Sequence, residues 1–381
     1  MSRDHSTAET ANIVARVYKP TFSEAARQRF VLGVKLLANK PMQQRVRRHY
    51  ETAILPQVSA RLGRSPVSRR EVEREVAASP EFRDWATFAH YSQSMMWNAV
   101  EATTRRSLQR AGALYEQVTN RADDCGSLKL NPDLAVPWPI GATEIHRQPQ
   151  GYAVSEHDHD LAAGLRYLGS SLIYGPAKGN AADATDARGA EIVTQLHDRF
   201  PGLAPERVLE LGCGIARAGQ TVARAFAPAE YHGVDVAPGL LRMAHLLARE
   251  NRVPMHFHQR DAADTGFAGG SFDLVVSFIL FHETSHDKLG AILRECHRLL
   301  RPGGAMLHLD VAIQTRRLNL VDQTLNDWQV RWNGEPFWTG FAETDMRRAI
   351  VDAGFSGDNV FAEYMHRGDG GAWHVFGGVR D

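Results

Sequence analysis

Short apolar runs alternate with helix-length amphipathic segments in the second half of the chain. The runs are rich in β-branched or aromatic residues and occupy residues 207–212, 231–236, 255–261, 272–280 and 305–311. Between them lie segments such as 238–251 and 286–300, in which apolar residues recur at helical spacing. Such alternation is typical of parallel strands joined by right-handed crossovers. It predicts a doubly wound, mostly parallel α/β domain over residues 201–381.

The first 130 residues have a different pattern, which predicts an N-terminal helical domain over residues 1–130. Ser68 and Glu71 have the spacing of a capping box, and Ser79-Pro80 is typical of an N-cap followed by proline at the first helical position. An apolar stripe at helical spacing follows, at Phe82, Trp85, Ala89 and Met96. We interpret this stripe as a packing surface, because every helix in a bundle needs one.

Residues 131–200 differ from both flanking regions. They are rich in proline, glycine and small polar residues, which predicts loops and a short helix. We interpret them as a connecting segment that caps a substrate site. A second candidate lid lies at residues 314–342, between the last predicted strand and a final predicted helix at 343–353.

Charge narrows the possible functions. Lys and Arg total 44 among the 381 residues, and Asp and Glu also total 44, so no overall field favours nucleic acid or an anionic membrane. The charges are unevenly spread, because residues 1–130 hold 21 basic and 13 acidic side chains. This basic excess could attract an anionic acceptor or partner, and a solvated helical surface explains it at least as well.

The cysteines and the N-terminus indicate a cellular compartment. Cys125, Cys213 and Cys296 are too few and too far apart for a disulfide framework or a zinc ribbon, and they suit a reducing interior. The N-terminus lacks the apolar core of a signal peptide, and the longest apolar run, near residues 274–281, is far shorter than the roughly 20 residues that span a bilayer. We expect a cytoplasmic protein without membrane attachment.

A glycine-rich loop follows the first predicted strand of the α/β domain. In "ELGCGIARAG", Gly212 and Gly214 lie where a strand turns into a helix, and glycine there lets a ligand approach the backbone. Asp235 ends the second strand, where a carboxylate can accept hydrogen bonds from both ribose hydroxyls. Asp261 ends the third strand and could accept a hydrogen bond from an adenine amine, with Ala262 leaving room for the base. In this order the residues predict a pocket for an adenosine.

At these residues the chain resembles the class I, Rossmann-like S-adenosylmethionine-dependent methyltransferases. "VLELGCGIARAG", "GVDVAP", "RDAAD", "FDLVVSFILFHE" and "LLRPGGAMLHLD" are similar to the successive motifs of that family, over about residues 200–312. "FHET" and "ILRECHRLLRPGG" look most like the ubiquinone/menaquinone-type subgroup. Ala216 departs from the family, in which many members have glycine. The resemblance implies S-adenosyl-L-methionine as cofactor, S-adenosyl-L-homocysteine as product, and these cofactor-binding residues: Glu210, Gly212, Cys213, Gly214, Asp235, Val236, Asp261, Ala262 and Ser277.

The segment "HETSH" contains His282, Glu283 and His286 in the spacing H-E-x-x-H. On a helix this spacing would place two imidazoles on one face as zinc ligands. Here His282 directly follows an apolar strand, so we expect a strand-to-helix junction and no metal site. At the carboxyl edge of the sheet, His282 and Glu283 are the predicted catalytic residues, with His282 as a base of near-neutral pKa. An equally good alternative is that they cap the next helix.

The acceptor must be selected outside the cofactor motifs. The predicted substrate-binding residues are Tyr167, Tyr174, His286, Trp332 and Trp338, although packing against the helical domain explains the tryptophans equally well. The leading prediction is methyl transfer to O, C or N of a small organic acceptor of natural-product or quinone type, without nucleic acid as partner and with a homodimer as an open possibility. The alternatives are an RNA or protein methyltransferase, a nicotinamide-dependent oxidoreductase and a non-catalytic scaffold.

Overall fold

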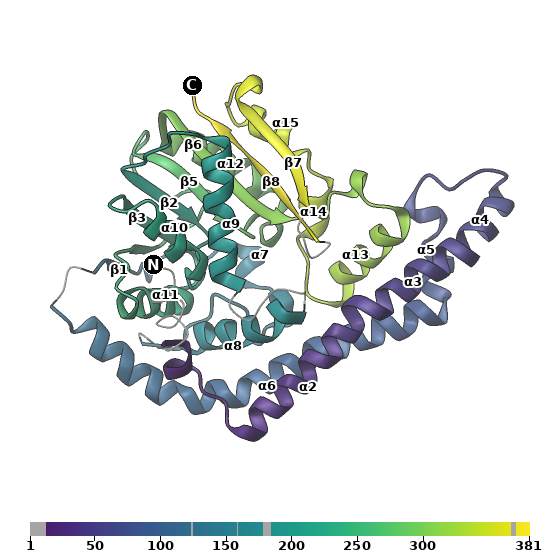
Figure 1. The fold of residues 1–381 in the computed structure, drawn as a ribbon, viewed down its shortest axis with the longest axis horizontal. Coiled ribbons are helices and arrows are strands. Elements are labelled where there is room, and N and C mark those ends of the chain that lie inside the picture. Colours follow the sequence, from purple (N-terminus) through teal and green to yellow (C-terminus); the bar gives the residue numbers. More distant parts are fainter. Residues whose placement is uncertain (1–12, 123–124, 158, 178–183, 367–370) are drawn as a thin grey trace, which may run out of the picture.

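A sheet of eight strands forms the centre of the molecule (Figure 1). The computed structural model describes residues 13–122, 125–157, 159–177, 184–366 and 371–381. The strand order is β1-β4-β3-β2-β5-β6-β8-β7. The strands are β1 (Ser127–Lys129), β2 (Arg207–Leu211), β3 (Glu230–Asp235), β4 (His256–Gln259), β5 (Phe272–Phe278), β6 (Leu300–Val311), β7 (Val360–His366) and β8 (Ala372–Val379).

The sheet is mostly parallel, as predicted. Strands β1 to β6 pair in parallel, and β8 pairs in antiparallel fashion with both β6 and β7. The five strands predicted after residue 201 are confirmed as β2 to β6. Residues 127–129, at the end of the predicted helical domain, form the edge strand β1 beside β4. Three residues are too few to show an alternating pattern, so only the pairing with β4 makes this segment a strand.

The helices of the α/β domain cover both faces of the sheet. Apolar residues alternate along each strand, so that Val208 and Leu274 pack on one face while Leu209 and Val275 pack on the other. The first face carries residues of α9, α10 and α11, and the second carries residues of α12, α14 and α15. The bounds are α9 (Ala184–Arg199), α10 (Arg217–Ala225), α11 (Pro238–Glu250), α12 (His286–Leu299), α14 (Trp338–Glu343) and α15 (Met346–Asp352).

The N-terminal region forms the predicted helices. Its elements are α2 (Phe22–Leu37), η1 (Ala38–Met42), α3 (Gln43–His49), η2 (Tyr50–Ile54), α4 (Leu55–Leu62), η3 (Arg69–Glu71), α5 (Glu73–Ala78) and α6 (Pro80–Thr119). Ser68 and Glu71 form the expected capping box. Ser79 caps α6 by accepting a hydrogen bond of 3.3 Å from the Phe82 amide, and the predicted stripe of α6 is buried.

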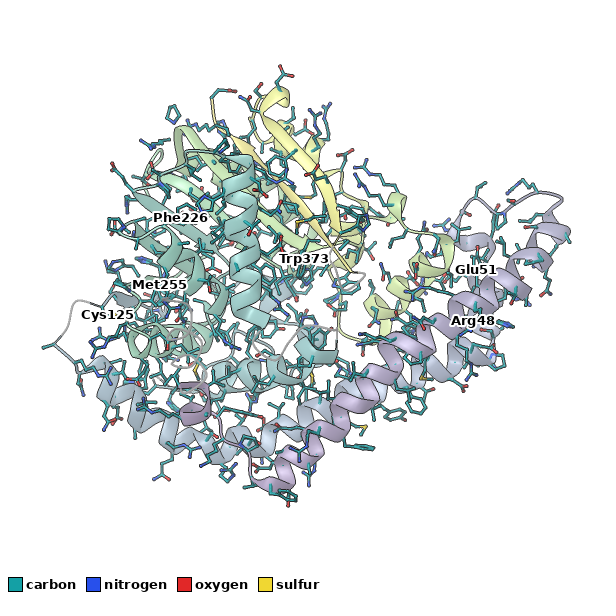
Figure 2. The ribbon with its side chains drawn as sticks, viewed as in Figure 1. Arg48, Glu51, Cys125, Phe226, Met255 and Trp373 are labelled. Carbon is teal, nitrogen blue, oxygen red and sulfur yellow. The ribbon has the colours of Figure 1, made fainter. Side chains whose placement is uncertain are left out.

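The helical domain packs on the α/β domain through α8 (Ala162–Ala177) and α11. Helix α11 is buried on two sides, because Leu241 and Ala244 pack against the sheet while Leu240 and Met243 join the core shared with α2, α6 and α8. The remainder of the helical domain extends beyond the sheet, where Arg48 and Glu51 lie far from the strands (Figure 2). Among the described residues, no helix is long and apolar enough to cross a membrane.

The segment predicted as a second lid is helical. Residues 314–342 contain η6 (Thr315–Arg317), α13 (Leu320–Trp332) and the start of α14. Helix α13 packs on the helical domain, with the Trp328 and Trp85 ring centroids 4.8 Å apart. Trp328 is therefore a packing residue. The loop after α13 returns the chain to the carboxyl edge of the sheet at Trp338.

Candidate functional site

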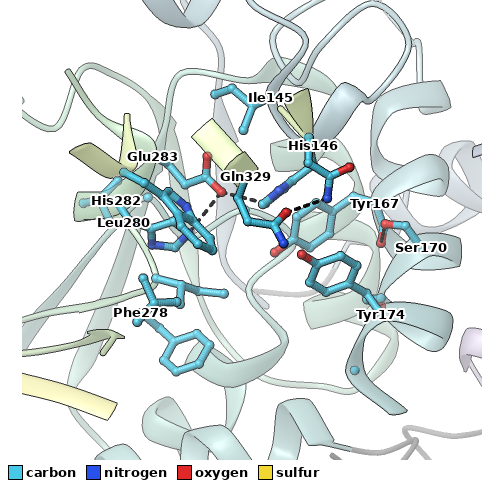
Figure 3. Close-up of a pocket in the computed structure, with 18 of the residues that line it drawn as sticks. Ile145, His146, Tyr167, Ser170, Tyr174, Phe278, Leu280, His282, Glu283 and Gln329 are labelled. Atoms are coloured by element: carbon cyan, nitrogen blue, oxygen red, sulfur yellow. Dashed lines mark hydrogen bonds and ion pairs between the residues drawn. The ribbon is translucent and has the colours of Figure 1, made fainter. Parts of the chain in front are cut away.

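A cavity of about 570 Å³ lies between the carboxyl edge of the sheet and the helices α2, α6 and α8. Its walls include the loop after β2, the end of β3, the segment after β5 and residues of α13. Ligands of open α/β sheets bind beyond the carboxyl ends of the strands. The cavity is therefore the candidate site, and Figure 3 shows residues of α8 facing the 278–283 segment across it.

The glycine loop has the backbone conformation that its sequence predicts. Gly212 and Gly214 have φ values of 63° and 53°, which side chains strongly disfavour. A Cβ atom on Gly212 would also approach Leu280 Cδ1 to 2.6 Å. Ala216, the departure from the family pattern, adopts a left-handed φ of 51° at the N-cap of α10. Its methyl group is buried, and this conformation costs a residue other than glycine some backbone strain.

Asp235 connects the glycine loop to the end of β3. One carboxylate oxygen accepts a 2.9 Å hydrogen bond from the Gly214 amide, and the other accepts one of 2.9 Å from the Ala237 amide. Burial raises the pKa of Asp235, and these backbone hydrogen bonds oppose the shift. Asp235 and Val236 both line the cavity, where a carboxylate with two remaining acceptor positions can bind a diol.

Glu210 lies beneath the glycine loop and also lines the cavity. Burial raises its pKa to about 8, while a hydrogen bond of 3.1 Å from the Tyr231 hydroxyl opposes the rise. Gly219 in α10 leaves room for this carboxyl group, because a Cβ atom there would lie 2.0 Å from Glu210 Oε2. Cys213 lines the same part of the cavity, and burial raises the pKa of its thiol well above the usual value.

Three of the predicted cofactor-binding residues do not line the cavity. Asp261 forms a 2.7 Å ion pair with Lys288 and accepts a hydrogen bond from the Ala263 amide. Ala262 packs against the core beneath α12 and α14, and Ser277 is buried within β5, 2.8 Å from His308 Nδ1. The structure thus brings together the glycine loop, Glu210 and Asp235. The adenine contacts of Asp261 and Ala262 and the cofactor-binding role of Ser277 remain predictions.

The H-E-x-x-H segment is a strand-to-helix junction, as expected. Strand β5 ends at Phe278, Phe281–Glu283 form the short helix η5, and His286 begins α12. His286 lies 3.4 Å from the Thr344 hydroxyl and does not line the cavity, whereas His282 and Glu283 do. The two histidines of the motif are therefore not paired.

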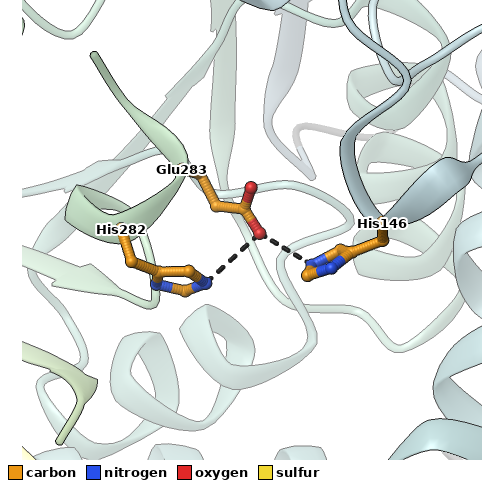
Figure 4. Close-up of side chains that lie close together, drawn as sticks. All are labelled: His146, His282 and Glu283. Atoms are coloured by element: carbon orange, nitrogen blue, oxygen red, sulfur yellow. Dashed lines mark ion pairs between the residues drawn. The ribbon is translucent and has the colours of Figure 1, made fainter. Parts of the chain in front are cut away.

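A different histidine joins His282 and Glu283. His146 Nε2 lies 2.7 Å from Glu283 Oε1, and His282 Nε2 lies 3.2 Å from the same oxygen (Figure 4). On its other side, each ring contacts a buried carboxylate: His146 Nδ1 is 2.8 Å from Glu335 Oε1, and His282 Nδ1 is 2.5 Å from Asp310 Oδ1. We call these five residues the His–Glu cluster.

The carboxylates of this cluster shift the pKa of both histidines. Burial alone would lower the pKa of both histidines, but the adjacent carboxylates outweigh it and raise the pKa of His146 and of His282 to about 10. Burial would raise the pKa of Glu283, but the two rings lower it far below its usual range. The predicted near-neutral pKa of His282 is therefore wrong for this arrangement, and its catalytic role remains a prediction.

The opposite wall of the cavity is aromatic. Tyr152, Tyr167 and Tyr174 line it, and burial raises the pKa of each hydroxyl, so all three remain protonated phenols. The Tyr174 ring centroid is 5.7 Å from that of His146, and Lys35 Nζ lies 5.1 Å from the Tyr174 centroid. We call these three tyrosines the tyrosine wall.

The predicted substrate residues divide into two groups. Tyr167, Tyr174 and Trp338 line the cavity. His286 and Trp332 do not, and Trp332 is 60% exposed. Their substrate roles remain predictions.

Four residues of the His–Glu cluster and the tyrosine wall were not predicted from the sequence: His146, Tyr152, Asp310 and Glu335. Asp310 carries the one recognisable signal, because it lies near the carboxyl end of a predicted strand, like Asp235. His146 lies in the short helix η4 (Ile145–Arg147) and Glu335 lies in a loop. Neither has a diagnostic spacing, so no local pattern could have identified them.

Comparison with known proteins identifies one domain. Residues 208–304 match the family model described as "Methyltransferase domain". The chain is 29% identical over 178 residues to a reducing polyketide synthase, grgA, of a Penicillium species, which covers 45% of this chain and 7% of that protein. It is 36% identical over 107 residues to a fatty-acid O-methyltransferase of Mycolicibacterium smegmatis, covering 28% of this chain and 37% of that protein. The chain thus spans a minor part of these curated relatives.

Solved structures give weaker likenesses. A phosphoethanolamine N-methyltransferase 2 from Haemonchus contortus shares 16% identity and a TM-score of 0.41, covering 50% of this chain and 52% of that chain. A Nostoc punctiforme protein shares 16% identity and a TM-score of 0.44, covering 98% of this chain and 99% of that chain.

Proposed function

Because this chain contains an S-adenosylmethionine-dependent methyltransferase domain, we propose that it methylates a small organic acceptor bound in the cavity at the sheet edge. The acceptor carries an oxygen-bearing carbon on an apolar body, as fatty acyl, polyketide and quinone compounds do. The relatives named as a reducing polyketide synthase and a fatty-acid O-methyltransferase support an acyl-derived compound. The quinone-type subgroup rests only on the motif that follows β5.

One observation carries this proposal. A single cavity joins the glycine loop and Asp235 to the His–Glu cluster and the tyrosine wall. A cofactor held by Asp235 would therefore share an enclosed space with an acceptor held beside Glu283. Its volume of about 570 Å³ falls in the range of about 300–1,000 Å³ that is typical of small-molecule sites.

The residues of the cavity suit methyl transfer from a sulfonium. Asp235 would accept hydrogen bonds from the ribose hydroxyls, and the Gly212 and Gly214 backbone would contact the methionine part of the cofactor. Tyr152 and Tyr167 provide aromatic rings that could attract a cation, an interaction of about 0.5–2 kcal/mol per ring, whereas the Tyr174 ring already has Lys35 Nζ 5.1 Å from its centroid. Because the sulfonium already carries an activated methyl group, alignment of the acceptor atom with the S–CH₃ bond is the main contribution required of the protein.

The position of the acceptor follows from the chemistry of the walls. Ile140, Met96 and Trp97 provide apolar surface, and Lys35 provides positive charge at the helical side of the cavity. Arg47 also lines this side, but its charge is paired with Asp322 at 2.7 Å. An apolar acceptor with an anionic or strongly polar group would therefore fit the helical side. We retain a small molecule, not nucleic acid, as the proposed partner.

Two measurements test the proposal. Isothermal titration calorimetry should detect binding of S-adenosylhomocysteine and no binding of NADH. Incubation with S-adenosylmethionine that carries a deuterated methyl group should then label a member of a panel of fatty acids, β-keto acyl thioesters and quinols, as detected by mass spectrometry. Binding of NADH without binding of S-adenosylhomocysteine would contradict the proposal. Labelling of RNA or protein in place of these compounds would contradict the acceptor class.

A further inference from the structure

We propose that His146, His282 and Glu283 bind a divalent first-row transition-metal or zinc ion, which holds an oxygen atom of the acceptor. The metal site stands on the geometry of these residues alone. Its role toward the acceptor rests on the proposed methyltransferase function.

The three side chains converge as metal ligands do. Glu283 Oε1 is 2.7 Å from His146 Nε2 and 3.2 Å from His282 Nε2, and the ligand atoms of all three residues lie within 4.8 Å of one another. Metal–ligand distances of about 2.1 Å place neighbouring ligand atoms roughly 3–3.5 Å apart. The two distances to Glu283 lie close to this spacing, so a small adjustment of the three side chains would enclose an ion.

Each histidine is oriented by a second carboxylate. Asp310, fully buried in β6, contacts His282 Nδ1 and also accepts a 2.8 Å hydrogen bond from the Phe281 amide. Glu335, 2% exposed, contacts His146 Nδ1. Metal-binding histidines usually donate their other ring N–H to a carboxylate in this way, which directs Nε2 to the ion.

The backbone at His146 is held in a strained conformation. His146 and Arg147 have φ values of 53° and 58°, in the left-handed region that non-glycine residues rarely adopt. The His146 carbonyl accepts hydrogen bonds of 2.7 Å from Gln93 and 2.8 Å from Trp97, and its amide donates one of 2.6 Å to Gly334. Such strain persists where the surrounding structure imposes it, and it concentrates at functional sites. Here the left-handed backbone at His146 is held where the imidazole contacts Glu283.

Charge favours a cation at this position. Glu283, Asp310 and Glu335 place three carboxylates around two rings in a buried region. If both imidazoles are neutral, a divalent ion would compensate two of the three negative charges of the carboxylates. Without an ion, one additional proton on each imidazole would compensate the same two charges. The metal and the ring protons are thus competing occupants of one site.

The site opens on the cavity and favours particular metals. The side chains of His146 and Glu283 are 19% and 18% exposed, and both line the cavity. Three protein ligands leave coordination positions for an acceptor oxygen, and imidazole ligands favour zinc, iron, cobalt or nickel over magnesium or calcium. This set differs from the H-E-x-x-H motif, because His286 is not part of it.

The test is metal binding by the full chain. Protein dialysed against a chelator should bind one equivalent of Zn²⁺ or Co²⁺ by calorimetry, and Co²⁺ should give the visible absorption of a low-coordinate site. His146→Gln and Glu283→Gln should each weaken binding at least tenfold. His197→Gln, on the exposed part of α9, should leave binding unchanged, as should His286→Gln.

Binding of S-adenosylhomocysteine by each variant shows that it is folded. The proposal is overturned if the unmodified protein binds neither Zn²⁺ nor Co²⁺, or if His286→Gln abolishes binding while His146→Gln retains it. If S-adenosylhomocysteine binds and the metals do not, this inference fails and the methyltransferase proposal stands. If the metals bind and S-adenosylhomocysteine does not, the metal site stands and the methyltransferase proposal fails.

Discussion

Replacing Asp235 by alanine should weaken cofactor binding and destabilise the glycine loop. Asp235 accepts two backbone hydrogen bonds of 2.9 Å, from the amides of Gly214 and Ala237. Each buried donor left unpaired costs about 1–3 kcal/mol. Water in the cavity can partly replace the lost acceptor, so for the two amides together we expect a loss of roughly 2–3 kcal/mol in unfolding free energy. Loss of the ribose hydrogen bonds should cost a further ~1–3 kcal/mol of binding, which is about a 5- to 150-fold rise in Kd.

Two measurements separate these effects. Chemical denaturation without ligand reports the stability loss, and calorimetric titration of S-adenosylhomocysteine into folded protein reports the loss of affinity. Asp235→Asn retains an oxygen acceptor for one of the two amides, so it should be the more stable variant while still binding the ribose poorly. Asp287→Ala, exposed in the first turn of α12, serves as the control. An unchanged Kd in both Asp235 variants would show that Asp235 does not bind the ribose.

Three further predictions concern stability. The folded state retains a proton on Glu210 up to about pH 8, whereas an unfolded glutamate loses it near pH 4.5. The unfolding free energy of the native chain, relative to that of Glu210→Gln, should therefore fall as the pH rises. Denaturant titrations between pH 5 and pH 8 should show a fall of roughly 2–4 kcal/mol. Gly219→Ala should cost about 1–3 kcal/mol because its Cβ would meet Glu210, whereas Gly112→Ala in α6 meets nothing within 4 Å and should be neutral or stabilising in thermal melts. Ser79→Ala should cost about 1 kcal/mol by removing the cap of α6, and an unchanged melting temperature would contradict that assignment.

Local signals located strands β2 to β6, the glycine loop and the cap of α6, but not β1, β7 or β8. The strand after Pro201, the loop Gly212–Gly214 and the cap at Ser79 each depend on a few adjacent residues, and all are observed. Such features are predictable because hydrophobic period, φ > 0 at glycine and side-chain capping act within one or two turns of chain. The same signals placed Asp235 and His282 at the carboxyl edge of the sheet.

Pairing between distant segments was not predictable in this way. Residues 127–129 became a strand only through β4, and Asp261 is paired with Lys288 from α12. Lys288 offered no signal for this contact, because a lysine in the first turn of a helix is compatible with many partners. Such contacts depend on how the crossover helices and loops pack against the sheet, which the whole domain determines.

The sequence by itself therefore determined a mostly parallel α/β sheet with a glycine loop and an aspartate at the carboxyl edge. The tertiary structure alone decided which side chains face them across the cavity. His146 comes from the short helix η4 and Glu335 from the loop after α13, far apart in the chain, and they meet near Glu283 because α6 and that loop both reach the carboxyl edge of the sheet. Residues that are close in space but lie on separate short segments share no period, so their convergence becomes visible only when the chain is folded.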